Sequence, residues 1–280
     1  MLSRLNALLP KRFRKNEVPI PVVRLAGTIA VSSSLRSNLN LAGVSQALEK
    51  AFKVKEAPAV ALLVNSPGGA PVQSRLIYER VRSLAVEKEK QVLVFVEDVA
   101  ASGGYMIALA GDEIFADATS VVGSIGVVAA GFGFVDLIEK IGVERRVYTS
   151  GENKVILDPF QPKKQEDIDH LTNLQEDIHE VFIDMVKERR GDLLSDDDDI
   201  FSGLFWTGRK ARDLGLIDGL GDLRSILKAK FGDDAKPKLI PSERGFPFRR
   251  GGIGASRPYI SAADILSSLD ERAAWARFGL

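Results

Sequence analysis

The amino-acid sequence predicts an α/β protein with a mostly parallel sheet that is covered by helices on both faces. Short apolar runs rich in β-branched residues alternate with longer segments whose apolar residues recur at helical spacing. The short runs are continuously apolar, which indicates strands that are buried on both faces. Repeated βαβ units are the simplest arrangement of such elements.

The predicted elements follow one another in regular order. Strands are expected at residues 20–26, 59–64, 91–96 and 113–116. Helices are expected between them, at residues 41–52, 72–87 and 103–110. Pro58 stands just ahead of the second strand, where no ladder donor is required. A long amphipathic helix is then expected at residues 163–190, followed by two short helices at residues 210–216 and 223–231.

Three parts are expected along the chain. Residues 1–19 form a basic segment with interspersed apolar residues, and residues 20–232 hold the predicted α/β domain. Residues 233–280 are expected to be a linker and a C-terminal helical tail, because residues 236–258 are rich in Pro, Gly and Arg. We expect the tail helix, residues 260–278, to dock on the domain or on a neighbouring subunit.

The composition excludes several classes of function. Lys plus Arg and Asp plus Glu both number 38, so no net charge favours nucleic acid as a partner. The chain has no cysteine, which excludes disulfides, thiolate metal ligands and a cysteine nucleophile. The four aspartates at 196–199 lack the spacing and the glycine of an EF-hand, so we expect a solvated loop and no metal site.

The sequence also bears on location. No run of 18 apolar residues occurs, so we expect no transmembrane helix. Residues 1–15 lack the continuous apolar core and the cleavage site of a secretory signal peptide. We therefore expect a cytoplasmic protein, with residues 1–19 either a frayed basic tail or an amphipathic segment in peripheral contact with the inner membrane.

Two glycine-rich turns directly follow predicted strands, at residues 65–69 (NSPGG) and 100–104 (AASGG). In an open α/β sheet, ligands collect where strands end and helix N-termini present free N–H groups. Glycine lets backbone amides approach a substrate closely, and one donor from each turn would make an oxyanion hole. Either turn taken alone is better explained by ordinary strand-to-helix turn chemistry. Neither contains the phosphate-loop pattern.

Ser102 is the candidate nucleophile. It precedes Gly103 and Gly104 at the start of a predicted helix, where an N-capping serine is an equally good interpretation. Position 100 is alanine, so the G-x-S-x-G pattern of the α/β hydrolases is absent. A nucleophilic serine needs a base, because a free hydroxyl is hardly ionised near neutral pH.

The scarcity of histidine limits the choice of base. His170 and His179 are the only two histidines, and both fall in the long predicted helix, where surface or half-buried positions suit them better than a catalytic triad. Lysine is the known substitute in Ser-Lys enzymes. Its pKa must then fall from about 10.4 to about 7–8, which desolvation can achieve. Lys154 precedes an apolar run, although by itself it reads as an ordinary solvated lysine.

Three motifs taken together resemble the protease IV (signal peptide peptidase) family, peptidase family S49. They are the NSPGG and AASGGY turns and residues 123–127 (GSIGV), in this order and spacing. The similarity runs from about residue 22 to residue 227 and is strongest to the short bacterial members with one catalytic domain. Residues 150–154 (SGENK) resemble the lysine motif of the family, and Lys154 falls 52 residues after Ser102.

The resemblance implies roles for particular residues. Ser102 would be the acylated nucleophile and Lys154 the general base of a Ser-Lys dyad. The backbone N–H groups of Gly69 and Gly103 would form the oxyanion hole, with Gly68 as a less favoured donor.

Two further roles follow by position. Ser124 would orient the lysine amine through a hydrogen bond, although a turn serine at the end of a strand is an equally good interpretation of the local sequence. Pro67 and Gly68 would contact an extended peptide substrate that adds as a strand beside them. No cofactor or metal is implied.

The resemblance also implies a fold, an assembly and a substrate class. The fold would be the crotonase-like superhelix of βαβ units shared with the caseinolytic protease, here with a C-terminal helical extension. Family members assemble as homo-oligomeric rings whose sites are often shared by neighbours, so Ser102 and Lys154 could come from different chains, although in single-domain relatives they come from one. The C-terminal segment of some relatives can lie in the active site of a neighbour. Substrates would be signal-peptide remnants or other hydrophobic, unstructured peptides.

Two other functions remain compatible with these motifs. A crotonase-type enzyme that acts on an acyl-coenzyme A thioester would use the same oxyanion amides but would leave Lys154 without a purpose. A non-enzymatic scaffold that organises membrane partners would not require Ser102 and Lys154 together.

Overall fold

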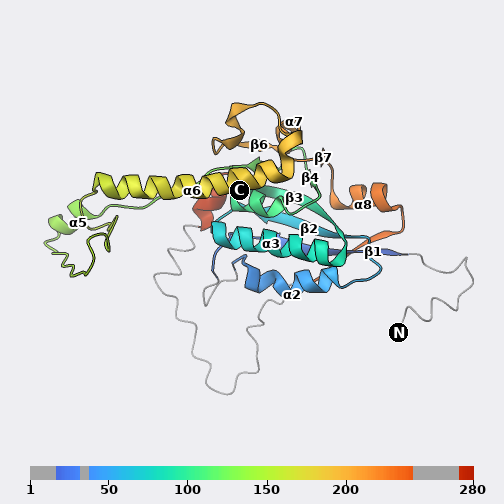
Figure 1. Ribbon diagram of the computed structural model, residues 1–280, viewed down its shortest axis with the longest axis horizontal. Coiled ribbons are helices and arrows are strands. Elements are labelled where there is room, and N and C mark those ends of the chain that lie inside the picture. The colour runs from blue at the N-terminus through green and yellow to red at the C-terminus, as the bar shows by residue number, and fades with distance from the viewer. Residues whose placement is uncertain (1–16, 32–37, 242–270) are drawn as a thin grey trace, which may run out of the picture.

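The computed structural model describes residues 17–31, 38–241 and 271–280. Most of the predicted basic segment and most of the predicted linker and tail helix lie outside the described residues. The predicted fold class is confirmed: helices pack on both faces of a central sheet that is parallel except at one edge (Figure 1).

The sheet has eight strands, and its main path runs in the order β6-β5-β3-β2-β1-β8. Strand β4 pairs with the first half of β3 on one side and with β7 on the other. Strand β5 pairs with the last residues of β3. The strands are β1 (Val18–Ala26), β2 (Ala59–Ser66), β3 (Gln91–Ala101), β4 (Glu113–Ala116), β5 (Val121–Gly123), β6 (Phe205–Thr207), β7 (Gly219–Leu220) and β8 (Ala235–Leu239).

The larger apolar core lies between this sheet and the helices of one face, chiefly α2, α3, α4 and the second half of α6 (Figure 1). A smaller core on the other face is covered by α8. The helices are α2 (Leu41–Phe52), α3 (Pro71–Lys88), α4 (Gly103–Ala108), α5 (Val135–Lys140), α6 (Gln165–Arg190), α7 (Gly208–Asp213) and α8 (Leu223–Phe231), with short 3₁₀ turns at Gly191–Leu193 and Asp198–Phe201.

Residues that the sequence assigned to the two terminal parts of the chain contribute strands to the sheet. Strand β1 begins at Val18, within the segment assigned to the basic N-terminus. Residues Ala235–Leu239, assigned to the linker, form β8 and pair in parallel with β1. Their Lys- and Pro-rich composition is that of an edge strand, where Pro237 is tolerated because one side of the ladder needs no donor.

Helix α6 is anchored to the domain only through its C-terminal half. Its buried residues are Phe182, Met185, Val186 and Arg190, and none lies before residue 182. Figure 1 shows that its first half continues beyond the sheet and carries α5 at its far end. We call residues 131–176 the arm. Within it, Phe134 stacks on Phe160 at 5.4 Å between ring centroids.

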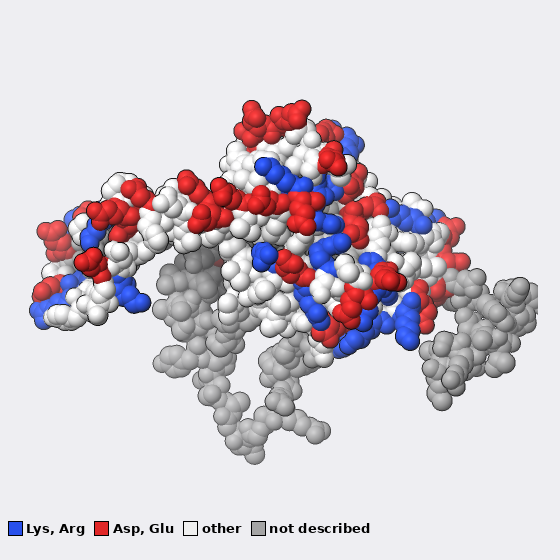
Figure 2. All heavy atoms as spheres, viewed as in Figure 1, with Lys and Arg blue, Asp and Glu red and all other residues white. Residues whose placement is uncertain are grey.

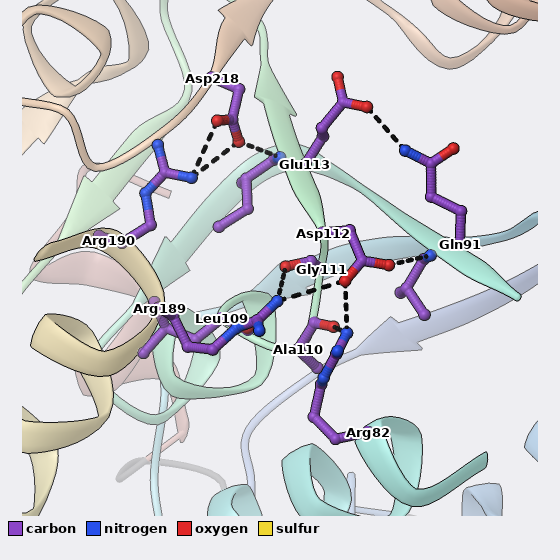
Figure 3. A network of polar contacts seen from close by, with 12 residues as sticks. Arg82, Gln91, Leu109, Ala110, Gly111, Asp112, Glu113, Arg189, Arg190 and Asp218 are labelled. Atoms are coloured by element: carbon purple, nitrogen blue, oxygen red, sulfur yellow. Dashed lines mark hydrogen bonds and ion pairs between the residues drawn. The ribbon is translucent and has the colours of Figure 1, made fainter. Parts of the chain in front are cut away.

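A polar network holds the C-terminal end of α6 (Figure 3). The guanidinium of Arg190 donates to both carboxylate oxygens of Asp218, at 3.0 and 2.8 Å, and to the Gly215 carbonyl at 2.8 Å. Arg189 donates to the Gly111 carbonyl at 2.8 Å, beside Asp112. These bonds join α6 to the loop after α4 and to the segment after α7, so they fix the root of the arm.

Charged groups are unevenly distributed over the surface. Figure 2 shows Asp and Glu along the outer side of α6 and near α7, whereas Lys and Arg gather over the side of the domain near α2 and α3. The outward side of α6 seen in that view is therefore a solvated surface. Within the described ranges, no helix is both long enough and apolar enough to cross a membrane.

We predict that Arg190→Ala lowers the free energy of unfolding by about 3 kcal/mol, because it leaves the Asp218 carboxylate without its buried partner. The Arg190 side chain is 4% exposed. Urea unfolding followed by circular dichroism measures this loss. Arg212→Ala is the matched control, because the Arg212–Asp213 pair is exposed and its loss should change stability by less than about 0.5 kcal/mol. Equal losses in the two variants would contradict the assigned role of Arg190.

Candidate active site

The candidate site lies where β2 and β3 end side by side. Because the two strands are parallel neighbours, the loop after Ser66 and the loop after Ala101 meet at one edge of the sheet. The two loops line a cleft of about 280 Å³, to which they contribute Pro67, Gly68, Gly69, Ser102 and Gly103. The structure therefore brings together five of the site residues predicted from the sequence.

An irregularity in β3 sets the alignment of these two loops. Val64 pairs with Val96 but Ser66 pairs with Ala100, so β3 has extra residues at this point. The Asn65 side chain fills the gap, donating to Asp98 Oδ2 at 2.6 Å and accepting from the Val99 N–H at 3.2 Å. Asn65 begins the NSPGG motif, and the sequence analysis gave it no role.

Ser102 occupies an unusual backbone conformation. Its φ of 52° and ψ of −124° are sparsely populated for a residue with a Cβ, at a cost of about 1–3 kcal/mol. Its N–H donates to the Gly123 carbonyl at 2.8 Å, and its carbonyl accepts from the Met106 N–H at 3.0 Å. Ser102 stands at the N-cap position of α4, yet its hydroxyl makes no capping hydrogen bond. Strain at a half-buried serine that lines a cleft is typical of a functional residue.

The glycines beside Ser102 differ in the availability of their amides. The Gly68 N–H donates to Ser66 Oγ at 3.2 Å, so it is already used. The N–H groups of Gly69 and Gly103 have no acceptor within the described parts of the chain. Gly103 opens α4, where the amide lacks an intrahelical partner. Two residues that line the cleft with Ser102 therefore have backbone donors that are unused among the described residues.

Close backbone packing leaves no room for a side chain at these loops. A Cβ at Gly69 would lie 2.1 Å from the Ile29 carbonyl oxygen, and one at Gly104 would lie 2.4 Å from the Ser66 carbonyl oxygen. Gly69 also has a φ of 139°. Ser66, which is fully buried, donates from Oγ to the Gly27 carbonyl at 2.7 Å and so ties the loop to β1. Sequence reasoning missed this role of Ser66, although the residue lies within the NSPGG motif.

Ser124 lies close to Ser102. Both residues line a second cavity, of about 260 Å³, beside the cleft. Ser124 is buried, has a φ of 53°, and donates its N–H to the Leu204 carbonyl at 2.6 Å. The structure thus brings this predicted site residue next to the predicted nucleophile.

His179 lies near the candidate site, which the sequence did not indicate. It lines the second cavity, and its Nε2 lies 3.0 Å from the carbonyl oxygen of Ile125. It therefore supports the segment after Ser124. The half-buried helical position matches the expectation for this histidine.

Apolar side chains form the remaining walls of the cleft. They come from α4, from α6 and from the segment after β5, and are Met106, Val127, Val128, Ile178 and Phe182. Ala274 and Arg277 of the C-terminal segment also line the cleft, and Phe278 packs edge-on against Phe205 of β6 at 4.9 Å. The end of the chain thus lies against the site of its own chain.

Lys154 is the predicted site residue that this chain does not bring to the others. It lies in the turn-rich loop between α5 and α6, within the arm, and is exposed. Figure 1 shows this segment at the far end of α6 from the sheet. No residue of the arm lines the cleft. Ser102 and Lys154 of one chain therefore do not line a common cavity, and the sequence left open whether one chain or two would supply them.

Comparisons with known proteins agree with the motifs. The pattern of the family described as "Peptidase family S49" matches residues 85–233. The protein named "Serine protease SPPA, chloroplastic" of Arabidopsis thaliana is 31% identical in an alignment of 256 positions that covers 89% of this chain and 36% of that protein. The protein named "Putative protease slr0021" of Synechocystis sp. is 33% identical in an alignment of 263 positions that covers 92% of each chain.

A relative of higher sequence identity is named as an antiporter and not as a protease. The protein named "Na(+)/H(+) antiporter NhaA" of Brucella abortus is 61% identical in an alignment of 286 positions that covers 99% of this chain and 39% of that protein. More than half of that relative therefore lies outside the match. This chain spans about two fifths of the length of the first relatives that it matches.

We predict that Gly69→Ala lowers the free energy of unfolding by about 3 kcal/mol, because the new methyl group would meet the Ile29 carbonyl in a left-handed backbone conformation. Thermal and urea unfolding measure the change. Gly131→Ala is the control: nothing lies within 4 Å of its added Cβ, so the change should stay below about 1 kcal/mol. A Gly69→Ala protein as stable as the control would show that the loop can move away from β1.

Proposed function

The chain belongs to peptidase family S49, and from that premise we propose that it is a serine endopeptidase with Ser102 as nucleophile and Lys154 as general base. The observation that carries the proposal is the strained Ser102 at the opening of α4, in a cleft also lined by Gly69 and Gly103, whose amides have no acceptor among the described residues. The backbone conformation of Ser102 fixes where its side chain begins, and the hydroxyl is not occupied by a capping hydrogen bond.

The reaction would proceed through an acyl-enzyme. An extended peptide lies beside the loop that contains Pro67 and Gly68, in the manner of an added strand. The neutral Lys154 amine accepts the proton of the Ser102 hydroxyl while Oγ forms a bond to the scissile carbonyl carbon. The C–N bond then breaks, and the leaving amine takes the proton back from the Lys154 ammonium. Water, activated by the same amine, hydrolyses the ester and releases Ser102.

The two free amides would stabilise the oxyanion of each tetrahedral intermediate. We assign this role to the N–H groups of Gly69 and Gly103, since the Gly68 N–H is used by Ser66. Each donor of this kind typically contributes a factor of about 10²–10³ to the rate. The donors belong to rigid backbone, so they need no reorganisation when the charge develops.

A second copy of the chain would supply the lysine. In one chain Lys154 is exposed at the end of the arm, so it reaches a Ser102 only if the arm extends over a neighbouring domain. The arm carries large exposed apolar side chains that such docking would bury, namely Phe132, Leu137, Ile141, Val143 and Tyr148. Docking would also remove water from the amine, which favours its neutral form. Repetition of this head-to-tail contact closes a ring.

Ser124 would then receive the incoming amine. It lines the smaller cavity together with Ser102, whereas Gly68 and Gly69 line the larger cleft. A hydrogen bond from its hydroxyl would orient the lysine toward the Ser102 oxygen.

The substrates would be hydrophobic, unstructured peptides, including signal-peptide remnants at or near a membrane. The walls formed by Met106, Ile178 and Phe182 offer an apolar environment to substrate side chains.

We predict that Ser102→Ala lowers hydrolysis of an unstructured apolar peptide by at least about 10³-fold, because no other group replaces the nucleophile. A fluorophosphonate probe should label the natural protein and not this variant. Ser83→Ala is the control, since Ser83 is an exposed serine of α3. Hydrolysis that persists in purified Ser102→Ala would sink the proposal, and the absence of any labelling would favour a non-enzymatic scaffold.

We predict that Lys154→Ala is equally inactive and that mixing it with Ser102→Ala restores activity. In randomly mixed rings, a Ser102 from one variant meets a Lys154 from the other at about a quarter of the sites, so about a quarter of the natural activity should return. Peptide turnover after co-refolding measures this recovery. Lys163→Ala, a change at another exposed lysine of the arm, should keep its activity. No recovery in co-refolded mixtures that assemble normally would refute the sharing of sites between chains.

A further inference from the structure

The hydroxyl group of Thr28 is a buried polar group that has no hydrogen-bond partner among the described residues. Thr28 lines the cleft together with Gly68, Gly69 and Ser102. Among the described residues, its Oγ1 is the one buried side-chain nitrogen or oxygen that makes no hydrogen bond. Buried hydroxyls are nearly always satisfied in folded proteins, so an exception at a candidate site calls for an explanation.

The position of Thr28 is fixed by its backbone. It follows β1, and its carbonyl accepts from the Leu39 N–H at 3.0 Å. The next residue, Ile29, donates to the Gly68 carbonyl at 2.9 Å and accepts from the Ala70 N–H at 2.7 Å. Thr28 is therefore held directly against the loop that carries the Gly69 amide, and it cannot move away without breaking these bonds.

Packing alone does not explain a threonine at this position. Valine has nearly the same shape and would place a methyl group where the hydroxyl now lies without a partner. The free protein would be at least as stable with valine, because an unsatisfied buried hydroxyl costs free energy that a methyl group does not.

We propose that Thr28 is a substrate-binding residue whose hydroxyl hydrogen-bonds the backbone of an extended peptide in the cleft. The inference rests on the proposed function and names a further residue for it. The side chain is half-buried and lines the cleft, and rotation about its Cα–Cβ bond exchanges the positions of hydroxyl and methyl. A hydroxyl both donates and accepts, so it can pair with either a peptide carbonyl or a peptide N–H. A hydrogen bond from the Thr28 hydroxyl to the peptide backbone does not depend on the peptide's side chains, so it suits a site that accepts many sequences.

Two substitutions test the proposal. Thr28→Val should raise KM for an unstructured apolar peptide by about 5–10-fold with kcat changed less than about twofold, because one substrate hydrogen bond is lost. Its unfolding midpoint should equal or exceed that of the natural protein. Thr28→Ser keeps the hydroxyl and should keep KM within about twofold.

The matched control is Thr119→Val. The Thr119 hydroxyl is already bonded to Asp117 at 2.6 Å, and Thr119 does not line the cleft. This variant should lose stability and keep its KM, which is the reverse of the pattern expected for Thr28→Val.

Binding to an inactive protein separates this proposal from the proposed function. Fluorescence anisotropy of a labelled apolar peptide should show about 5–10-fold weaker binding to Thr28→Val/Ser102→Ala than to Ser102→Ala alone. Equal binding, an unchanged KM in Thr28→Val, or loss of stability in that variant would overturn the role of Thr28 and leave the peptidase assignment intact. Hydrolysis by Ser102→Ala would instead overturn the nucleophile.

Discussion

The site depends on the close approach of backbone to backbone at the ends of β2 and β3. Gly69 and Gly104 allow this approach, because a Cβ at either position would collide with a carbonyl oxygen of the neighbouring segment. Gly69 and Gly103 also line the cleft, and their amides have no acceptor among the described residues. The close approach of the two loops that line the cleft therefore depends on the absence of side chains at Gly69 and Gly104.

Several features around this contact cost free energy. Ser102 and Ser124 have positive φ values, and the Thr28 hydroxyl has no hydrogen-bond partner among the described residues. The surrounding structure holds them in place: Ser102 and Ser124 each donate an N–H to a fixed carbonyl, and His179 contacts the carbonyl of Ile125. Such strain is common where a protein must be ready for a ligand before the ligand arrives, and the large apolar core offsets its cost.

Helix α6 connects two regions with different surroundings. Its C-terminal half is buried, contributes Phe182 to the cleft, and ends in the Arg190–Asp218 pair. Its first half is solvated on the outer side and leads to a loop that carries Lys154. A rigid helix thus holds the proposed base at a defined distance from its own domain. This arrangement suits a site completed by a neighbouring copy better than one completed within a chain.

The alternation of strands and helices, the two glycine turns and the candidate serine were predictable from the sequence, because each depends on patterns of neighbouring residues. Short or polar elements were not predictable in this way: β5 and β6 have three residues each, and β8 resembles a linker in composition. The contacts of Ser66 and His179 became visible only in the tertiary structure, since they join residues 39 and 54 positions apart. The same is true of the Thr28 hydroxyl, because its burial depends on how distant segments pack. The tertiary structure also decided where Lys154 lies. Motif order indicates which residues act together, but the direction of α6 decides which chain's cleft the lysine can approach.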